Sequence, residues 1–157
     1  MQATIERMTE SLVPERFTEV VQIAAPVAAV WNDLVSSEHM GLWMGDPSMD
    51  VRVETTWRVG SRFVVRGVHH VPFENSGVLL ALEPMKRLAY SHRSSLSGLP
   101  ERPSSYTTLD FAMEGDGDGT LLSLSATGFP SASIYHHLRF YWAGTLEVFK
   151  RYVESRA

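Results

Sequence analysis

The sequence contains no cysteine, which removes several kinds of chemistry from consideration. Without thiols the chain cannot form disulfides, build a thiolate metal site or use a cysteine nucleophile. No stretch approaches the roughly 18 consecutive apolar residues that a membrane-spanning helix needs, so we predict no membrane span. Residues 1–17 carry charges throughout and lack the apolar centre of a secretory signal, which favours a cytoplasmic protein.

Basic charge is also scarce, because acidic residues outnumber basic ones and the formal net charge is -4. The nearest approach to a basic cluster is Arg52, Arg58, Arg62 and Arg66, which are spread along strand-like sequence. A weakly acidic chain with dispersed arginines is a poor match for nucleic acid. We therefore predict no nucleic-acid partner.

The common catalytic and cofactor motifs are missing as well. The chain has no Gly-x-Ser-x-Gly nucleophile elbow and no glycine-rich phosphate loop behind a strand. His136 and His137 are adjacent on a predicted helix, so their side chains point about 100° apart and cannot bind one metal from one face. From these observations we predict no cofactor and no metal.

The residues that are present suffice for one folded domain. The chain has 157 residues, of which 44% are hydrophobic and 20% charged, as in ordinary globular proteins. We expect a single domain over residues 17–157. Residues 1–16 should precede it as a short helix or a flexible tail, because chain ends are often loose.

One strand and two short helices are predicted near the start of the domain. Residues 17–25 are rich in β-forming side chains and predict a strand. Pro26 suits the first position of a helix, and the apolar side chains of residues 27–35 then recur at helical spacing. Residues 37–44 predict a second short helix, ended by the glycine and proline that follow.

Strands and turns fill the middle of the chain, from residue 49 to residue 128. Residues 61–71 alternate polar and apolar side chains, and residues 78–84 form another apolar run behind Gly77. The GDGDG sequence at residues 115–119 predicts a tight hairpin turn between two further strands. Strands joined by such short turns form an antiparallel sheet.

The last segment, residues 131–157, predicts one long amphipathic helix. Tyr135, Leu138, Trp142, Leu146 and Phe149 recur every three or four positions and form a single apolar stripe. Such a helix must lie against one face of the sheet. We therefore expect an α+β fold in which a curved antiparallel sheet of about seven strands wraps around the C-terminal helix. A gap between those two layers is a common location for apolar ligands.

Several stretches, taken in order, resemble a known superfamily. They are PVAAVWNDLVSSEHMGLWMG, VGSRFVV, GVLLALEPMKRLAYSH, YTTLDFAMEGDGDGTLLSLSATGF and YWAGTLEVFKRYVE. They resemble the START-like or SRPBCC superfamily, whose architecture is the helix-grip or Bet v allergen fold. Within it they look most like the Aha-type activators of a heat-shock-chaperone ATPase. The resemblance covers roughly residues 17–154, and one departure is His92, where relatives often have an aromatic residue.

Strand alternation identifies the side chains that should face the helix. Arg62 and Arg66 mark one face of their strand as solvated, so the opposite face, with His69, should point inward. By the same alternation, Tyr90 and His92 share an inward face on a later strand. The side chains that we predict to line a ligand cavity are Trp43, Met44, Phe63, Val65, His69, Tyr90, His92, Phe111, Met113, Tyr135, Arg139 and Trp142.

Within this set, His69, His92 and Tyr90 are the candidates for catalysis. A histidine near neutral pKa can act as acid, base or hydrogen-bond donor, and the three would give an apolar pocket a polar end. Arg139 would help them to orient a ligand. The alternative is that each histidine is structural, bonded to backbone or water. Trp43 and Met44 would either close one end of the cavity or simply fill the core.

The superfamily is functionally mixed, so the resemblance implies an architecture and leaves three roles open. The first is binding of a small hydrophobic or aromatic molecule between sheet and helix. The second is a polyketide cyclase or aromatase that uses the cavity histidines. The third is a protein-interaction module with a chaperone partner, which predicts a filled core and a functional outer surface. The free edges of the sheet also allow a homodimer to form.

Overall fold

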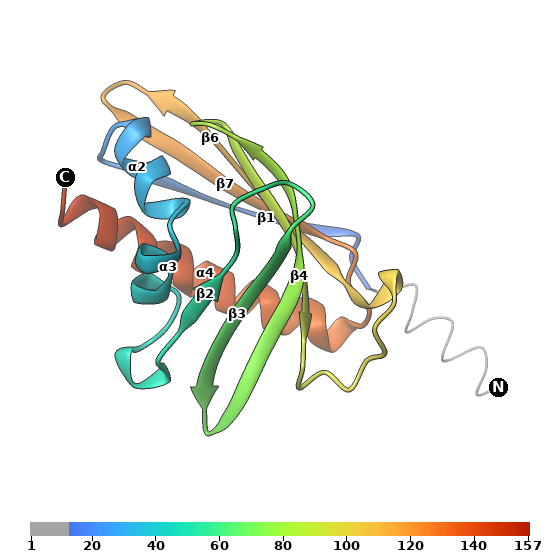
Figure 1. The fold of residues 1–157 in the computed structure, drawn as a ribbon. Coiled ribbons are helices and arrows are strands. Elements are labelled where there is room, and N and C mark those ends of the chain that lie inside the picture. The colour runs from blue at the N-terminus through green and yellow to red at the C-terminus, as the bar shows by residue number, and fades with distance from the viewer. Residues whose placement is uncertain (1–12) are drawn as a thin grey trace.

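A seven-stranded antiparallel sheet and one long helix dominate the computed structural model, which describes residues 13–157 (Figure 1). Most of the predicted N-terminal helix or tail, residues 1–12, lies outside the described residues. The elements in chain order are β1 (Arg16–Ile23), α2 (Val27–Leu34), α3 (Ser37–Trp43), η1 (Pro47–Met49), β2 (Arg52–Glu54), β3 (Arg62–His69), β4 (Val71–Glu83), β5 (Arg87–Ser94), η2 (Pro103–Ser105), β6 (Thr107–Asp116), β7 (Gly119–Thr127) and α4 (Ala132–Glu154).

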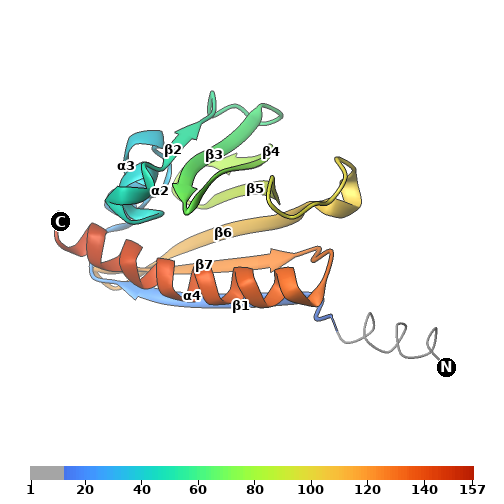
Figure 2. The ribbon, with the colours of Figure 1, turned by 90° about the horizontal axis from the view of Figure 1, so that it is seen from below.

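The sheet has the strand order β1-β7-β6-β5-β4-β3-β2, and all its neighbours pair antiparallel. The turn predicted from GDGDG joins β6 to β7, and Gly117 supplies the positive φ of 61° that this turn needs. The sheet curves, so that α4 lies along β1 and β7 while β2 to β5 bend over the same side (Figure 2). The α+β architecture, including the two short helices after the first strand, is therefore confirmed.

Serine and proline residues set the helix starts as the sequence indicates. The Ser131 hydroxyl accepts a hydrogen bond from the Ile134 amide at 3.2 Å, which caps α4. Ser36 caps α3 in the same way through the amide of His39. Pro26 comes directly before α2 and holds extended backbone there.

Strand β4 is longer than the sequence indicates. It begins at Val71 instead of after Gly77, and its first half pairs with both neighbours, for example Asn75 with Val65 and with Ser94. Local propensity is weak in this stretch, which contains proline, asparagine and glycine. Pairing on both sides outweighs that propensity and extends the strand.

The free edge of β1 is covered by side chains of α4. The Lys150 ammonium donates to the carbonyl oxygen of Gln22 at 2.5 Å. Just past the strand, the amide of Ala24 donates to the Glu154 carboxylate at 2.7 Å. The opposite edge strand, β2, is only three residues long. Short or covered edges oppose strand addition, so the sheet edges are poor surfaces for the predicted homodimer.

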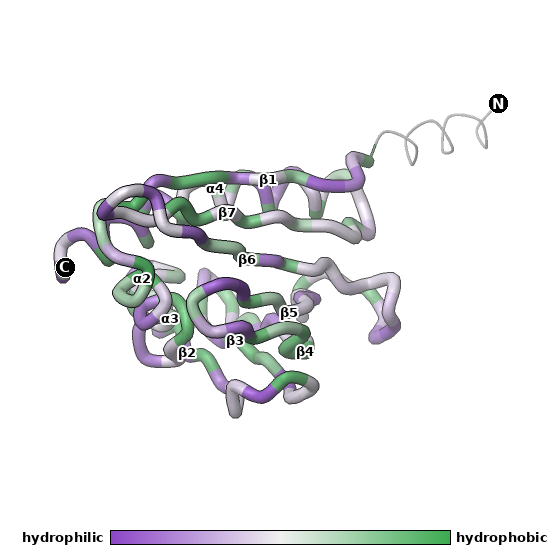
Figure 3. Tube along the Cα trace, turned by 90° about the horizontal axis from the view of Figure 1, so that it is seen from above, coloured by the Kyte–Doolittle hydropathy of each residue, from purple (hydrophilic) through white to green (hydrophobic). Residues whose placement is uncertain are grey.

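The hydrophobic core lies between the sheet, α4 and the two short helices. Hydrophobic and hydrophilic residues alternate along the strands, so one sheet face packs inward while the other meets solvent (Figure 3). Leu138, Trp142, Leu146 and Phe149 of α4 are all at most 3% exposed. Within the described part of the chain, no helix combines the length and the apolarity needed to cross a membrane.

Candidate functional site

A row of aromatic rings runs through the interior from β3 to α3, across the space where a cavity is predicted. Phe63 stacks on Tyr90 with ring centroids 4.0 Å apart, and Tyr90 lies 6.2 Å from Phe111. Phe111 meets the edge of Trp142 at 5.4 Å, and Trp142 lies 6.4 Å from Trp43. All five side chains are at most 2% exposed. The chain's own rings therefore occupy this part of the sheet–helix interface.

Trp43 and Met44 pack as core residues at the end of this row. The Trp43 ring lies 4.7 Å from Phe149, and its indole N–H donates to the backbone oxygen of Asp33 at 3.0 Å. The Met44 side chain is buried, and its carbonyl oxygen accepts a hydrogen bond from Tyr141 at 2.5 Å. Of the two predicted roles, core filling fits these contacts.

One polar group in the aromatic row has no partner. The Tyr90 hydroxyl is buried and makes no hydrogen bond to any described residue. Burial raises the pKa of Tyr90, and the nearby Tyr141 raises it further, so the hydroxyl keeps its proton at neutral pH. Buried hydroxyls almost always find a partner, and an unmet donor costs about 1–3 kcal/mol. Tyr90 therefore presents an unused hydrogen-bond donor inside the protein.

His92 follows on the same face of β5, two residues along. Its side chain is half-buried, opposite Thr107 of β6. Desolvation, with a smaller contribution from His137 of α4, lowers the pKa of His92 from 6.5 to about 4. The imidazole is therefore neutral at pH 7, with one nitrogen free to accept and one to donate. Tyr90 and His92 together form a neutral polar site faced by α4.

The lowered pKa of His92 predicts a specific acid sensitivity. The unfolded chain binds this proton near pH 6.5 and the folded chain only near pH 4, so the unfolded state holds more protons between those values. The contribution to stability is complete above pH 6.5 and is lost as the pH falls toward 4. In the wild type the free energy of unfolding should therefore fall between pH 7 and pH 4. We expect this fall to be smaller by about 1–2 kcal/mol in His92→Gln, a figure that allows for the partial exposure of His92. Denaturation of the wild type and the variant at pH 7 and at pH 4 measures this difference. The control is His136→Gln, on the exposed face of α4, which should behave as the wild type.

His69 does not point into the interior, which corrects the sequence-based prediction. It is exposed at the tip of the β3–β4 hairpin, beside the equally exposed His70. The strand ends at His69, and His70 turns the chain with a φ of 66°. Alternation still assigns His69 to the inward face, but no helix or strand among residues 13–157 covers the tip of this hairpin. The structure thus separates His69 from Tyr90 and His92.

Tyr135 and Arg139 lie on the other side of α4 from His92. The Tyr135 ring meets Phe17 of β1 at 6.0 Å, and the Tyr135 hydroxyl accepts a hydrogen bond from Arg139 at 2.7 Å. Arg139 also approaches the carboxylate of Glu19 on β1 at 3.9 Å. These two residues therefore lie on the β1 side of the helix. The prediction that Arg139 orients a ligand together with the histidines is wrong, because Arg139 lies away from both of them.

The remaining predicted lining residues, Val65 and Met113, are inward-facing and buried. The sequence analysis missed Tyr141 and His137, which approach Tyr90 and His92 from α4. Both lie beside the apolar stripe of α4 instead of within it. Periodicity places them beside the stripe, but only the structure shows that this flank faces β5.

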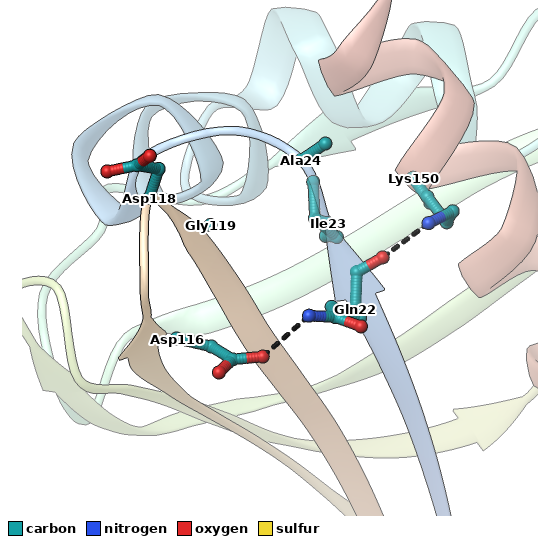
Figure 4. Close-up of a pocket in the computed structure, with 7 residues that line it drawn as sticks. All are labelled: Gln22, Ile23, Ala24, Asp116, Asp118, Gly119 and Lys150. Carbon is teal, nitrogen blue, oxygen red and sulfur yellow. Dashed lines mark hydrogen bonds between the residues drawn. The ribbon is translucent and has the colours of Figure 1, made fainter.

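Two hollows on the described surface both lie outside the sheet–helix interface. The first, of about 380 Å³, lies where the β6–β7 turn meets the end of β1 (Figure 4). There Gln22 donates to Asp116 at 2.7 Å and Lys150 reaches the Gln22 carbonyl. The second, of about 490 Å³, lies between α3 and β2, beside the exposed Leu42. Neither contains a residue of the predicted cavity.

The requirements of a cyclase-type site and of a metal site can be compared with this geometry. A cyclase-type site calls for a hydrogen-bonded histidine–tyrosine pair, but the Tyr90 hydroxyl bonds to nothing among residues 13–157, His92 included. In the same residues, no three His, Asp or Glu side chains come together as metal ligands. What the site offers is a donor and a neutral imidazole next to aromatic rings. That chemistry suits binding more than acid–base catalysis.

The family model described as Activator of Hsp90 ATPase homolog 1-like protein matches residues 24–154. The match covers most of the chain. This protein belongs to that family. The family resemblance drawn from the sequence motifs is thereby confirmed, and the helix-grip architecture agrees with it. A comparison with curated proteins finds no match.

Solved structures with the family's architecture superpose on most of the chain. Protein CV1439 from Chromobacterium violaceum has a TM-score of 0.77 at 21% identity, over 90% of this chain and 98% of that one. ChR145 from Cytophaga hutchinsonii has a TM-score of 0.74 at 25% identity, over 92% and 97%. The Aha1 dimer from Colwellia psychrerythraea has a TM-score of 0.71 at 17% identity, over 88% and 96%. These similarities concern the fold.

Proposed function

We propose that this protein binds a small, uncharged, largely apolar molecule between the sheet and α4. The ligand would carry a hydrogen-bond acceptor that meets the Tyr90 hydroxyl and a polar atom that meets His92. The buried, unpaired hydroxyl of Tyr90 carries the proposal. A partner from outside the chain would supply the hydrogen bond that the chain itself leaves unmade.

The surroundings of the two groups define the ligand's chemistry. Tyr90 and His92 are both neutral at pH 7 and lie in a desolvated environment, so an ion would lose its hydration without gaining a countercharge. A carbonyl, ether or hydroxyl on an aromatic or aliphatic body matches them better. The rings of Phe63 and Phe111 lie on either side of Tyr90 and would contact that body.

Binding also requires a movement, because the aromatic row fills the interior. His92 is half-buried, and Tyr141 and Ile134 on the facing side of α4 are half-buried as well. This is where the polar site comes nearest to solvent. We expect the ligand to enter there, with Tyr141 giving up its hydrogen bond to Met44 as the helix shifts.

Tyr90→Phe should make the ligand-free protein more stable while weakening binding. Removing a buried hydroxyl without a partner should raise the free energy of unfolding by about 1 kcal/mol, or the melting temperature by about 3 °C. The matched control is Tyr141→Phe, which should lower stability by about 1 kcal/mol because it breaks the bond to Met44. Thermal unfolding of the three proteins measures both signs. Equal losses in the two variants would contradict the assignment of an unmet donor.

The binding itself is tested with the uncharged apolar dye N-phenyl-1-naphthylamine and by native mass spectrometry of freshly purified protein. We expect saturable dye fluorescence from the folded protein, and about tenfold weaker binding of any co-purified molecule by the Tyr90→Phe variant. His69→Gln, at the exposed hairpin tip, should leave both unchanged. No dye uptake together with no co-purified mass would end the proposal.

A second candidate is a chaperone-activator-like interaction, favoured by a different observation. The interior is occupied by the chain's own side chains, while both hollows are open on the outer surface. That is the arrangement predicted for a protein-interaction module. Retention of an Hsp90-type chaperone by immobilised protein, with its ATPase rate raised, would support this role.

A further inference from the structure

We propose that the outward face of α4 is a contact surface for a second copy of this chain, packed antiparallel to the first. Figures 1 and 2 show α4 covering the sheet with one side, while no described strand or helix lies over its other side. The proposal concerns that outer side, and among its residues His137 also lies near His92 of the ligand site.

Two residues one turn apart make this face unusual. Phe140 is 84% exposed, which is the highest exposure among the large hydrophobic side chains that reach the surface of the described chain. Gly144 lies in the middle of the helix, where glycine is less favourable than alanine. Within 4 Å of the position that its Cβ would take there is nothing. Packing inside one described chain therefore explains neither residue.

The two residues belong to a regular seam. Ser133, His137, Phe140, Gly144, Glu147 and Arg151 follow one another at intervals of four, three, four, three and four, and all are exposed. This is the spacing with which one helix faces another in a coiled coil. The opposite side of α4, with Leu138, Trp142 and Phe149, is the buried one.

The seam is complementary to itself when read in the reverse direction. If two α4 helices pack antiparallel with the twofold axis at residue 142, Phe140 of each copy meets Gly144 of the other. The large ring then fills the notch left by the missing side chain. Outside this centre, His137 meets Glu147, and Ser133 meets Arg151. A twofold interface requires this reciprocity of every contact.

Charge supports the same register. Across the described residues, Glu147 and Arg151 take part in no ion pair within 4.0 Å, although they are one turn apart. In the antiparallel pair, each Glu147 gains a histidine partner. A parallel pair would instead place Glu147 against Glu147 and Arg151 against Arg151, so like charges would oppose it.

A single helix pair buries less area than a standard protein–protein interface. We therefore expect a weak dimer with a dissociation constant on the order of 10–100 µM. Sedimentation equilibrium from about 10 µM to about 1 mM should show the dimer in the wild type, and Phe140→Glu should weaken it at least tenfold. Leu42→Glu, at an exposed leucine on α3, is the matched control and should not change it. Circular dichroism verifies that each variant folds.

The absence of cysteine makes the register directly testable. A mixture of the Ser133→Cys and Arg151→Cys variants should form the mixed disulfide under mild oxidation, in excess of either homodimer. Predominant homodimers would overturn the antiparallel register. A monomer at every concentration would overturn the proposal.

Discussion

Replacing Trp43 with alanine should lower the free energy of unfolding by about 3–5 kcal/mol, the largest loss that we expect from one side chain. The indole is 2% exposed, contacts Phe149 and Trp142, and donates a hydrogen bond to the Asp33 backbone. Truncation removes that contact area, leaves a cavity and strands the carbonyl oxygen. Urea denaturation measures the loss.

The neighbouring Leu42→Ala is the control, because Leu42 is 60% exposed and should change stability by less than about 0.5 kcal/mol. The same comparison separates the two roles predicted for Trp43. A residue that closes a ligand cavity would tolerate truncation in the ligand-free protein. If Trp43→Ala lowered the free energy of unfolding by less than about 1 kcal/mol, the cavity-closing role would be supported instead.

Arg156→Met should lower the midpoint of urea denaturation, because it leaves a buried carboxylate without its main partner. The Arg156 guanidinium bonds to the Asp33 carboxylate at 2.6 Å, and that side chain is only 5% exposed. A weaker bond from Asn32 at 3.2 Å remains after the substitution. Because Arg156 itself is 43% exposed, we place the loss below that of a fully buried pair.

A double-mutant cycle tests the origin of this loss. Once Asp33 is changed to asparagine, the further change Arg156→Met should have an effect below about 0.5 kcal/mol. Arg58→Met, at an exposed arginine, should also be close to neutral. If Arg156→Met were equally harmful with asparagine at position 33, the loss would come from contact with the Tyr152 ring instead.

The sequence predicted the inward face of the strands well because alternation is a local property. Phe63, Tyr90 and Phe111 all point inward, as the pattern indicates. His69 fails because the pattern gives the face of a strand but not whether another element covers it. Its strand extends beyond the helix layer and ends in an uncovered turn.

The candidate site was predictable only in part. Periodicity gave the apolar stripe of α4, yet it does not say which strand lies on each side of the helix. Arg139 and His92 were therefore assigned to one pocket although Arg139 contacts β1. The filled interior could not be predicted either, because it depends on how the rings of distant strands interlock in three dimensions.

The covered edge of β1 bears on how solutions of this protein would deteriorate. The cover consists of two side chains from the last turns of α4, Lys150 and Glu154. Helix ends open far more often than whole domains, and such an opening bares main-chain groups beside an otherwise intact sheet. Strands of other molecules can then add there and seed fibrils. The rate of aggregation would thus follow the fraying of the C-terminal turns, and binding partners that hold these turns in place would slow it.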